Sequence, residues 1–280
     1  MISASDVLEE PSETLPGMRI AFDGDCAQAN GVDLPVVVIN LPHRVDRWQA
    51  LSRRMAAIGL TKLIKAPAID GRQLSDRQVA MLLRSPADVS HAPRSHLTLT
   101  RPAIGCFLSH LAIWRWVHER NVPRVLVLED DACPLAGRGP AEFRDVLASI
   151  PADADLVFLG QLIMGGLADR HAGATLARLY YFNGTFAYLI TPRACARLIA
   201  HALPMHAHVD HQLSQFFVAQ RDVFPAYYAA PQLFEPDWSL RSDCYVPLAD
   251  DTAADRELGA LIARTRTALL GEGRMLLPAA

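Results

Sequence analysis

Three acidic residues, Glu129, Asp130 and Asp131, stand in a row directly after the apolar segment 125–128. Like charges this close repel one another, and burial increases the cost. An extended chain points its first and third side chains to one side and its second to the other, so Glu129 and Asp131 can face one ligand while Asp130 turns away. Two carboxylates beside phosphate oxygens are a usual way to hold Mg²⁺ or Mn²⁺. The triplet predicts a divalent-cation site, with a solvated acidic turn as the alternative.

Two arginines, Arg44 and Arg47, lie three residues apart where a helix is expected to begin. Basic side chains are unfavourable there, because the helix dipole already presents positive charge at its N-terminus. Their placement is explained if an anion docks at the strand-to-helix turn. A pair of solvated arginines near Asp46 is the simpler alternative.

Histidines form a third candidate group, with His206, His208 and His211 around Asp210. Imidazole is a common transition-metal ligand, but this stretch has neither H-E-x-x-H nor a compact three-ligand motif, so a three-histidine zinc site is a minor alternative. We expect one histidine, His211 or His208, to complete a manganese shell or to contact a diphosphate. His110, inside a very apolar stretch, is either a buried histidine bonded to a neighbour or a residue of the same site.

Strands and helices that position these residues alternate along the chain. Apolar runs bounded by polar residues predict buried strands, and apolar residues at helical spacing with capping residues predict helices. The expected strands cover 35–40, 62–69, 124–128 and 155–160, and the expected helices cover 43–59, 76–83, 103–120, 142–149, 191–203, 209–221 and 255–271. Two further strands are expected to flank Asn183-Gly184, a dipeptide that favours a turn. Segments 85–102 and 231–251 are expected to be irregular. The alternation predicts an α/β fold with a mostly parallel sheet and helices on both faces.

Composition limits the class of protein. A formal net charge of −3 over 280 residues argues against a nucleic-acid binder. No apolar run approaches the roughly 20 residues that span a bilayer, and the acidic N-terminus is not a secretory signal. The five cysteines are scattered without a C-x-x-C pair, which is typical of reduced cytosolic thiols. We therefore expect a cytoplasmic protein with an extension at 1–33, one domain at 34–250 and a helix within 251–280.

Four segments resemble, in order, the blocks of glycosyltransferase family 25, which includes lipooligosaccharide galactosyltransferases and collagen galactosyltransferase domains. They are "VVVINLPHRVDRWQALSRRM", "APAIDG", "AIGCFLSHLAIWRWVHERNVPRVLVLEDDA" and "NGTFAYLITPRACARLI". The resemblance implies a GT-A-type nucleotide-sugar transferase fold. It also implies transfer of a hexose, galactose or glucose, from a UDP-sugar to a hydroxyl of a surface glycan such as lipooligosaccharide, with inversion.

The same resemblance implies roles for individual residues. Glu129 and Asp131 match the acid-x-acid motif that holds Mn²⁺ (or Mg²⁺), and His211 is expected to be a further metal ligand. Asp210 is the expected catalytic base, because the attacking hydroxyl needs a carboxylate to take its proton; Asp153 or Asp155 is the fallback. The implied donor-binding residues are Asn40, Arg44, Asp46, Arg47, Asp70, Ser109, His110, Asp130, Gly184 and Thr185.

Two other functions stay open. A Mg²⁺-dependent phosphohydrolase also favours acids at strand ends, but it needs an aspartyl nucleophile or acids after other strands, which "VVVIN" and "LVFLG" do not supply. A non-catalytic relative that only binds a sugar nucleotide is the second. The expected C-terminal helix sets arginines beside leucines, so peripheral contact with the inner membrane face is a further hypothesis; such a helix more often packs on its own domain.

Overall fold

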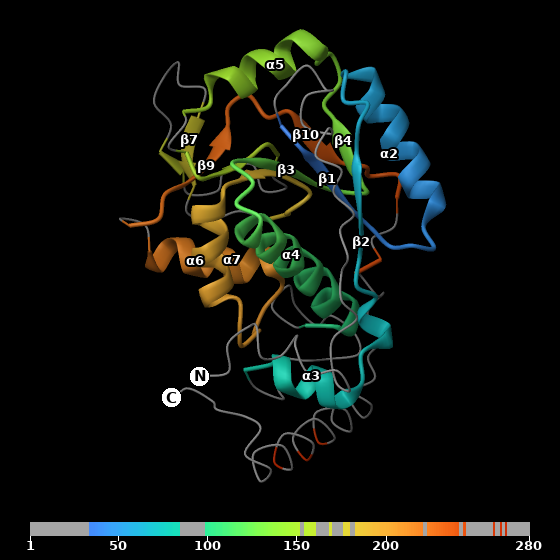
Figure 1. Ribbon diagram of the computed structural model, residues 1–280, viewed down its shortest axis with the longest axis vertical. Helices are drawn as coiled ribbons and strands as arrows, with labels where there is room; N and C mark the ends of the chain where they lie inside the picture. Colours follow the sequence, from blue (N-terminus) through green and yellow to red (C-terminus); the bar gives the residue numbers. More distant parts are fainter. Residues whose placement is uncertain are drawn as a thin grey trace.

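Figure 1 shows a computed structural model of the chain. The structure describes residues 34–84, 99–151, 154–160, 168–169, 176–179, 183–220, 223–240 and 243–244, together with 260, 264 and 267. The extension expected at 1–33 lies outside these residues. So does the C-terminal helix expected within 251–280, apart from the three helical positions 260, 264 and 267.

An eight-stranded sheet forms the centre of the molecule, with strand order β2-β1-β3-β8-β5-β9-β7-β6 (Figure 1). Its strands are β1 (Val36–Asn40), β2 (Ile64–Pro67), β3 (Val125–Glu129), β5 (Leu156–Phe158), β6 (Ala168–Asp169), β7 (Leu176–Leu179), β8 (Ala187–Ile190) and β9 (Ala226–Ala229). β1 is parallel to β2 and β3, and β5 is parallel to β9, whereas β8 and β7 run antiparallel to their neighbours. All strands except β7 and β8 therefore share one direction, which confirms an α/β fold with a mixed, mostly parallel sheet.

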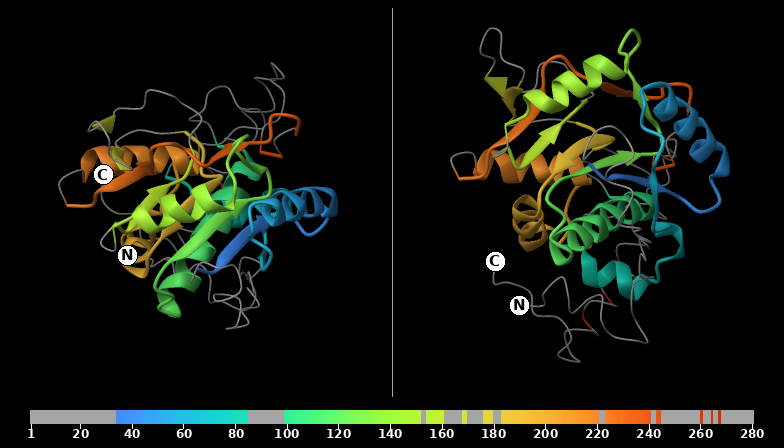
Figure 2. Two further views of the ribbon diagram at one scale, coloured as in Figure 1. Left: turned by 90° about the horizontal axis from the view of Figure 1, so that it is seen from above. Right: turned by 45° about the horizontal axis from the view of Figure 1, so that its top comes forward.

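Helices cover both faces of this sheet. They are α2 (Val45–Ala57), α3 (Asp76–Leu82), α4 (Arg101–Glu119), α5 (Pro140–Ser149), α6 (Pro192–His201) and α7 (Val209–Ala219), with a short 3₁₀ helix η2 (Gly71–Gln73). Side chains alternate along β1, so Val37 and Ile39 enter one core and Val36 and Val38 the other. The first core contains apolar residues of α3, α4, α6 and α7, and the second contains those of α2 and α5. Figure 2 shows α2 and α5 on the side of the sheet opposite α4 and α6.

The largest helix, α4, begins earlier than its apolar pattern predicts. Thr100 caps it by accepting a hydrogen bond from the backbone N–H of Ala103, and Pro102 occupies the first turn, where a missing N–H costs nothing. The segment 85–102, expected to be irregular, therefore ends inside the helix. Within the part of the chain that the structure describes, no helix has both the length and the apolar character that a membrane crossing requires.

One assignment needs correction. β7 and β8 flank Asn183-Gly184 as expected; β7 pairs with β9, and β8 inserts between β3 and β5. Segment 231–251, expected to be irregular, contains β10 (Phe234–Pro236), which pairs antiparallel with β4 (Ala132–Pro134). This error arises because the partner of β10 lies far away in sequence, so no local pattern reports the pairing.

Two glycines bring η2 directly against α4. A Cβ atom at Gly105 would lie 2.5 Å from the carbonyl oxygen of Ile69 and closer still to the backbone nitrogen of Gly71. A Cβ at Gly71 would collide with the carbonyl group of Arg101. The chain after β2 therefore lies on the N-terminal half of α4 with no room for a side chain.

We expect Gly105→Ala to destabilise the protein by about 1–3 kcal/mol, because the added methyl group must push backbone apart. Alanine alone favours a helix over glycine by about 1 kcal/mol, so the sign of the change separates the two effects. Urea unfolding followed by circular dichroism measures it. Gly139→Ala is the control, since its Cβ would meet only the flexible carboxylate of Glu142 at 3.1 Å. Stabilisation of the Gly105 variant would contradict the close contact.

Candidate functional site

The carboxyl ends of β1 and β3 lie side by side, because these strands are parallel and Ile39 stands opposite Glu129. Ligands of α/β proteins gather at this edge of the sheet. A pocket opens there, with about 590 Å³ of space when the open solvent at its mouth is included. Its charged lining residues are Arg47, Asp70, Arg72, Glu129, Asp130, Asp131 and Asp243.

Asp130 is buried and points back toward β1 and α2. One of its oxygens accepts a hydrogen bond from Asn40 Nδ2 at 2.7 Å, and the other accepts one from Arg47 Nη1 at 2.9 Å. Asn40 Nδ2 also donates to the carbonyl oxygen of Arg44 at 3.0 Å. This set, called the Asp130 latch below, ties the β1–α2 turn to the turn after β3. Three of the predicted donor-binding residues, Asn40, Arg47 and Asp130, are thus brought together.

Glu129 is held from behind by a chain of buried polar groups. Its Oε1 accepts a hydrogen bond from Thr185 Oγ1 at 2.7 Å and lies 3.2 Å from His110 Nε2. His110 Nδ1 lies 2.9 Å from the hydroxyl of Tyr188, which accepts a bond from Trp114 Nε1 at 3.0 Å. Because an ionised carboxylate can only accept, His110 Nε2–H donates to Glu129, and the remaining Nδ1 accepts from the Tyr188 hydroxyl. His110 is thus a buried histidine bonded to its neighbours, and its role toward a donor stays a prediction.

The protonation states of Glu129 and Asp131 are pushed in opposite directions. Burial alone would raise the pKa of Glu129, but the hydrogen bonds from His110 and Thr185 outweigh it and hold that pKa below its usual value. Burial, with repulsion from Glu129 and Asp130, raises the pKa of Asp131 to about 7. Asp131 Oδ1 is buried and has no hydrogen-bond partner among the described residues. An unpaired buried carboxylate oxygen beside a second carboxylate is the donor set that a hard divalent cation requires.

Arginines neutralise the other acids of the pocket. Arg47 pairs with Asp130, Arg72 Nε contacts Asp70 at 2.8 Å, and Arg44 Nη1 contacts Asp243 at 2.5 Å. None of the ion pairs among the described residues joins an arginine to Glu129 or Asp131. The negative charge at the end of β3 is therefore left for a ligand to balance.

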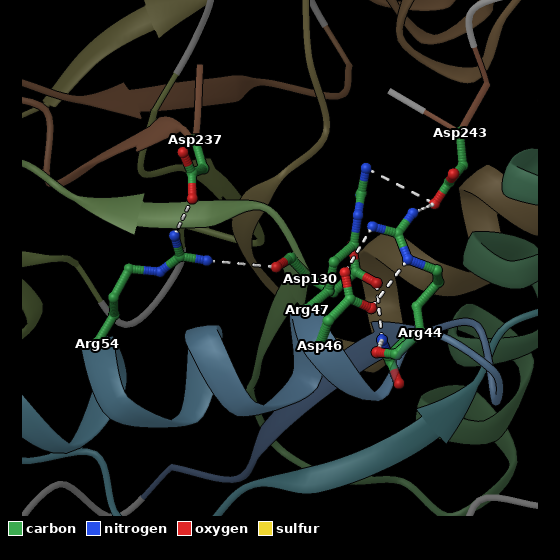
Figure 3. A network of polar contacts seen from close by, with 8 residues as sticks. Arg44, Asp46, Arg47, Arg54, Asp130, Asp237 and Asp243 are labelled. Carbon is green, nitrogen blue, oxygen red and sulfur yellow. Dashed lines mark hydrogen bonds and ion pairs between the residues drawn. The ribbon is translucent and has the colours of Figure 1, made fainter. Parts of the chain in front are cut away.

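Residues 237–240 and 243–244, together called the strap, place two carboxylates beside the site, where Asp237 faces Arg54 and Asp243 faces Arg44 and Arg47 (Figure 3). Asp243 reaches both Arg44 and Arg47, the latter at 3.6 Å. Asp237 forms an ion pair with Arg54, and its backbone N–H donates to the carbonyl oxygen of Asp131 at 2.7 Å. The anion expected beside Arg44 and Arg47 is thus supplied in this structure by carboxylates of the protein itself, and Asp46 adds an exposed pair with Arg44.

The remaining predicted donor residues lie around the same pocket. Asp70 caps η2 by accepting from the backbone N–H of Arg72 at 3.1 Å, and it faces the pocket. Ser109 also lines the pocket, but its hydroxyl is used to donate to the carbonyl of Gly105 and to accept from the N–H of Ile69. Ser109 therefore fixes the segment after β2 on α4.

Gly184, Thr185 and Asp210 form a support behind the pocket. Gly184 has φ of 94°, which suits glycine, and its N–H donates to Asp210 Oδ2 at 2.8 Å. Asp210 Oδ1 accepts from the N–H of His211 at 2.9 Å, so each carboxylate oxygen already holds a backbone donor. Asp210 is buried and is not among the residues that line the pocket. Its predicted role as a base is untested by this geometry and stays a prediction.

The predicted histidine ligands and the two alternative catalytic bases, Asp153 and Asp155, lie in different parts of the structure. His211 is buried at the start of α7 and does not join a three-residue metal-ligand group in the described part of the chain. His206 Nε2 contacts Gln215 Oε1 at 2.8 Å. Asp155 precedes β5, at the amino ends of the parallel strands, where it accepts from Thr191. Asp153 lies outside the described residues.

Several site residues were missed by the sequence analysis. Asp243 and Asp237 gave no local signal, because Asp243 lies 199 residues from Arg44 and Asp237 lies 183 residues from Arg54. Cys106 and Cys244 line the pocket, and a hydrogen bond between their thiols, burial and the nearby carboxylates raise the pKa of Cys106 well above its usual value. The four-residue spacing of Cys106 and His110 on a helix was visible in the sequence and could have pointed to this pair.

Comparisons with known proteins agree on one family. Residues 33–134 match the family model described as "Glycosyltransferase family 25 (LPS biosynthesis protein)". The matched stretch includes the Asp130 latch, Asp70, His110 and the acidic turn.

Three curated relatives show how far the similarity extends. A glycosyltransferase 25 family member of Anopheles gambiae is 28% identical over 245 residues, which cover 79% of this chain and 40% of that protein. Procollagen galactosyltransferase 2 of Homo sapiens is 28% identical over 175 residues, covering 59% of this chain and 27% of that protein. Inactive glycosyltransferase 25 family member 3 of Homo sapiens is 32% identical over 133 residues, covering 45% and 21%. The chain thus spans at most two fifths of the length of these relatives.

The Asp130 latch makes a testable contribution to stability. We expect Asp130→Ala to lower the free energy of unfolding by about 3 kcal/mol, because the buried Arg47 would lose the carboxylate that it contacts at 2.9 Å. Urea unfolding measures the change.

Asp46→Ala is the matched control, since it removes an exposed carboxylate from the neighbouring ion pair with Arg44. It should have little effect on stability. Equal losses in the two variants would contradict a structural role of the latch.

Proposed function

The chain belongs to glycosyltransferase family 25, and from that premise we propose that it is an inverting, metal-dependent hexosyltransferase of the GT-A type that uses a UDP-sugar. The observation that carries the proposal is the buried, unpaired Oδ1 of Asp131 beside the ionised Glu129. Glu129 and Asp131 would hold Mn²⁺ or Mg²⁺, with His211 as a further proposed ligand. A bound cation there supplies a positive charge that neutralises the departing diphosphate.

The protein positions its ligand with groups that are already fixed. The Asp130 latch sets the direction of the acidic turn, and Thr185 with His110 sets the rotamer of Glu129. The nucleotide is proposed to lie in the pocket between Asp70 and the N-terminus of α2. Arg44 and Arg47 would face its diphosphate, since guanidinium groups suit phosphate oxygens. In this structure Asp243 of the strap forms ion pairs with both arginines. These ion pairs would have to break before the arginines could contact a diphosphate.

The acceptor hydroxyl attacks the sugar carbon, and a carboxylate must take the proton that this hydroxyl loses. Asp210 is the proposed base. Its two carboxylate oxygens now accept from the backbone N–H groups of Gly184 and His211, so neither is yet turned to an acceptor. A turn of the Gly184–Thr185 segment would free Oδ2 for the acceptor.

The proposed donor sugar and acceptor are taken from the names of the relatives and of the family. Galactose is the first donor sugar to test, because one relative is named a procollagen galactosyltransferase, and glucose is the second. The family description names lipopolysaccharide biosynthesis, which supports a surface glycan such as lipooligosaccharide as acceptor. A cytoplasmic location with peripheral contact at the inner membrane face belongs to the same proposal.

A non-catalytic sugar-nucleotide-binding protein is the second candidate function, because one relative is named inactive. The two candidates share the donor pocket and differ only in turnover. A phosphohydrolase is less well supported, since Asn40 ends β1 where a nucleophilic aspartate would be needed.

We expect UDP to bind the wild-type protein in the presence of Mn²⁺, and Asp131→Asn to weaken that binding at least about tenfold, the loss of about 1.4 kcal/mol. Isothermal titration of UDP with and without Mn²⁺ measures both. Asp155→Asn is the control, because Asp155 lies at the opposite edge of the sheet and faces Thr191. Failure of UDP to bind with any divalent cation would overturn the proposal.

Turnover separates the two candidate functions. We expect UDP release from UDP-galactose or UDP-glucose, and a loss of about 10²–10⁴-fold in Asp210→Asn with UDP affinity preserved. A coupled assay for UDP measures the rate. A matching loss of UDP affinity would show instead that Asp210 anchors the Gly184–Thr185 segment. Wild-type protein that binds UDP but never turns over would support the non-catalytic candidate.

A further inference from the structure

A second group of potential metal ligands lies at the floor of the pocket. Cys106 Sγ, a ring nitrogen of His110 and a carboxylate oxygen of Glu129 all lie within 4.8 Å of one another. Cys106 and Glu129 line the pocket, whereas the His110 side chain is fully buried behind them. An ion entering through the pocket would meet the sulfur and the carboxylate first.

The backbone already aims these three side chains at one point. Cys106 and His110 are four residues apart on α4, so they project from the same face of the helix. Paired ligands at this spacing on one helix are a known arrangement for zinc. Glu129 ends β3, and its contact with His110 Nε2 at 3.2 Å shows that the strand and the helix face approach without further movement.

Groups outside the three side chains support them as ligands. Metal-bound histidines usually donate their second ring N–H to a fixed acceptor. Here His110 Nδ1 lies 2.9 Å from the Tyr188 hydroxyl oxygen, which can accept from it and from Trp114 at once. Thr185 holds the carboxylate of Glu129. Binding requires the His110 hydrogen to move from Nε2 to Nδ1 and the Cys106 thiol proton to leave to solvent.

The chemistry of the ligands selects the ion. A thiolate, an imidazole and a carboxylate form the set that Zn²⁺ prefers, whereas Mn²⁺ and Mg²⁺ favour oxygen ligands alone. Three protein ligands leave a fourth position toward the pocket, beside the thiol of Cys244. We propose that Cys106, His110 and Glu129 form a zinc-binding site at the floor of the pocket, distinct from the Glu129–Asp131 pair but sharing Glu129 with it.

Cobalt tests the site directly, because Co²⁺ replaces Zn²⁺ and a thiolate ligand gives it a sulfur-to-metal charge-transfer band. Co²⁺ is titrated into the reduced, metal-free full-length chain, and Zn²⁺ is then added. We expect the band in the wild-type protein, its removal by Zn²⁺, and its loss in Cys106→Ser. Cys133→Ser is the matched control, because Cys133 lies on β4, where its thiol contacts the carbonyl oxygen of Pro134. No band in the wild-type protein, or a band that survives in Cys106→Ser, would overturn the site.

A measurement on the wild-type chain alone tests the site without a substitution, so that misfolding of Cys106→Ser cannot be mistaken for the loss of a ligand. We expect Zn²⁺ to slow the alkylation of Cys106 by N-ethylmaleimide, followed by peptide mass spectrometry, while the alkylation of Cys133 stays unchanged. Equal rates at Cys106 with and without Zn²⁺ would contradict the assignment.

If the proposed function holds, the zinc site and the manganese site share Glu129, so the two ions should compete. Zn²⁺ should lower Mn²⁺-supported UDP binding in the wild-type protein, and the ratio of UDP affinities with and without Zn²⁺ should approach one in Cys106→Ser. An unchanged affinity in the wild-type protein would refute the sharing. If UDP does not bind at all, the proposed function fails, and the cobalt band still decides the zinc site.

Discussion

The Asp130 latch is the constraint on which the rest of the site depends. Residues that follow neighbouring parallel strands meet at one edge of the sheet, but nothing in the sheet itself determines where their side chains point. By taking one bond from Asn40 and another from Arg47, Asp130 fixes the turn after β3 against the start of α2. Fixing Asp130 in this way holds the turn that it forms with Asp131 in one orientation, and all three acids line the pocket. The arginine that stabilises the fold and the acids that would bind a ligand are thus parts of one arrangement.

Within the described part of the chain, some carboxylates around this latch have an arginine in contact, and others do not. Each pocket acid outside the end of β3 has an arginine partner among the described residues, and the strap supplies Asp243 to Arg44 and Arg47. Burial makes an unbalanced carboxylate costly, which is why the pKa of Asp131 is raised. An unbalanced buried charge of this kind is typical of a functional site. The same charge that destabilises the protein without a ligand favours the binding of a cation.

Local patterns predicted much of this arrangement. The apolar run that ends at Asn40 and the helix that follows it were readable, because each depends on neighbours in sequence. The alternation expected within the acidic triplet was not, because Asp130 and Asp131 form a turn instead of an extended chain. The antiparallel insertion of β8, the β4–β10 pair and the strap were not, since their partners are distant and their own segments are short. His110 shows an intermediate case: its apolar helix predicted burial, but its contact with Glu129 required β3 to be placed first.

Glu129 differs from its neighbours in facing two chemically different surroundings. Asp131 offers oxygen atoms, whereas His110 and Cys106 offer nitrogen and sulfur, and Cys106 lines the pocket as Asp131 does. A carboxylate accepts either kind of ion, so the neighbours decide which is bound. The hydrogen bonds from Thr185 and His110 are both made to Oε1. Without zinc, the His110 hydrogen therefore occupies the position at Oε1 that such an ion would need, and the hydrogen bonds of His110 and Thr185 leave Oε2 to an oxygen-bound cation.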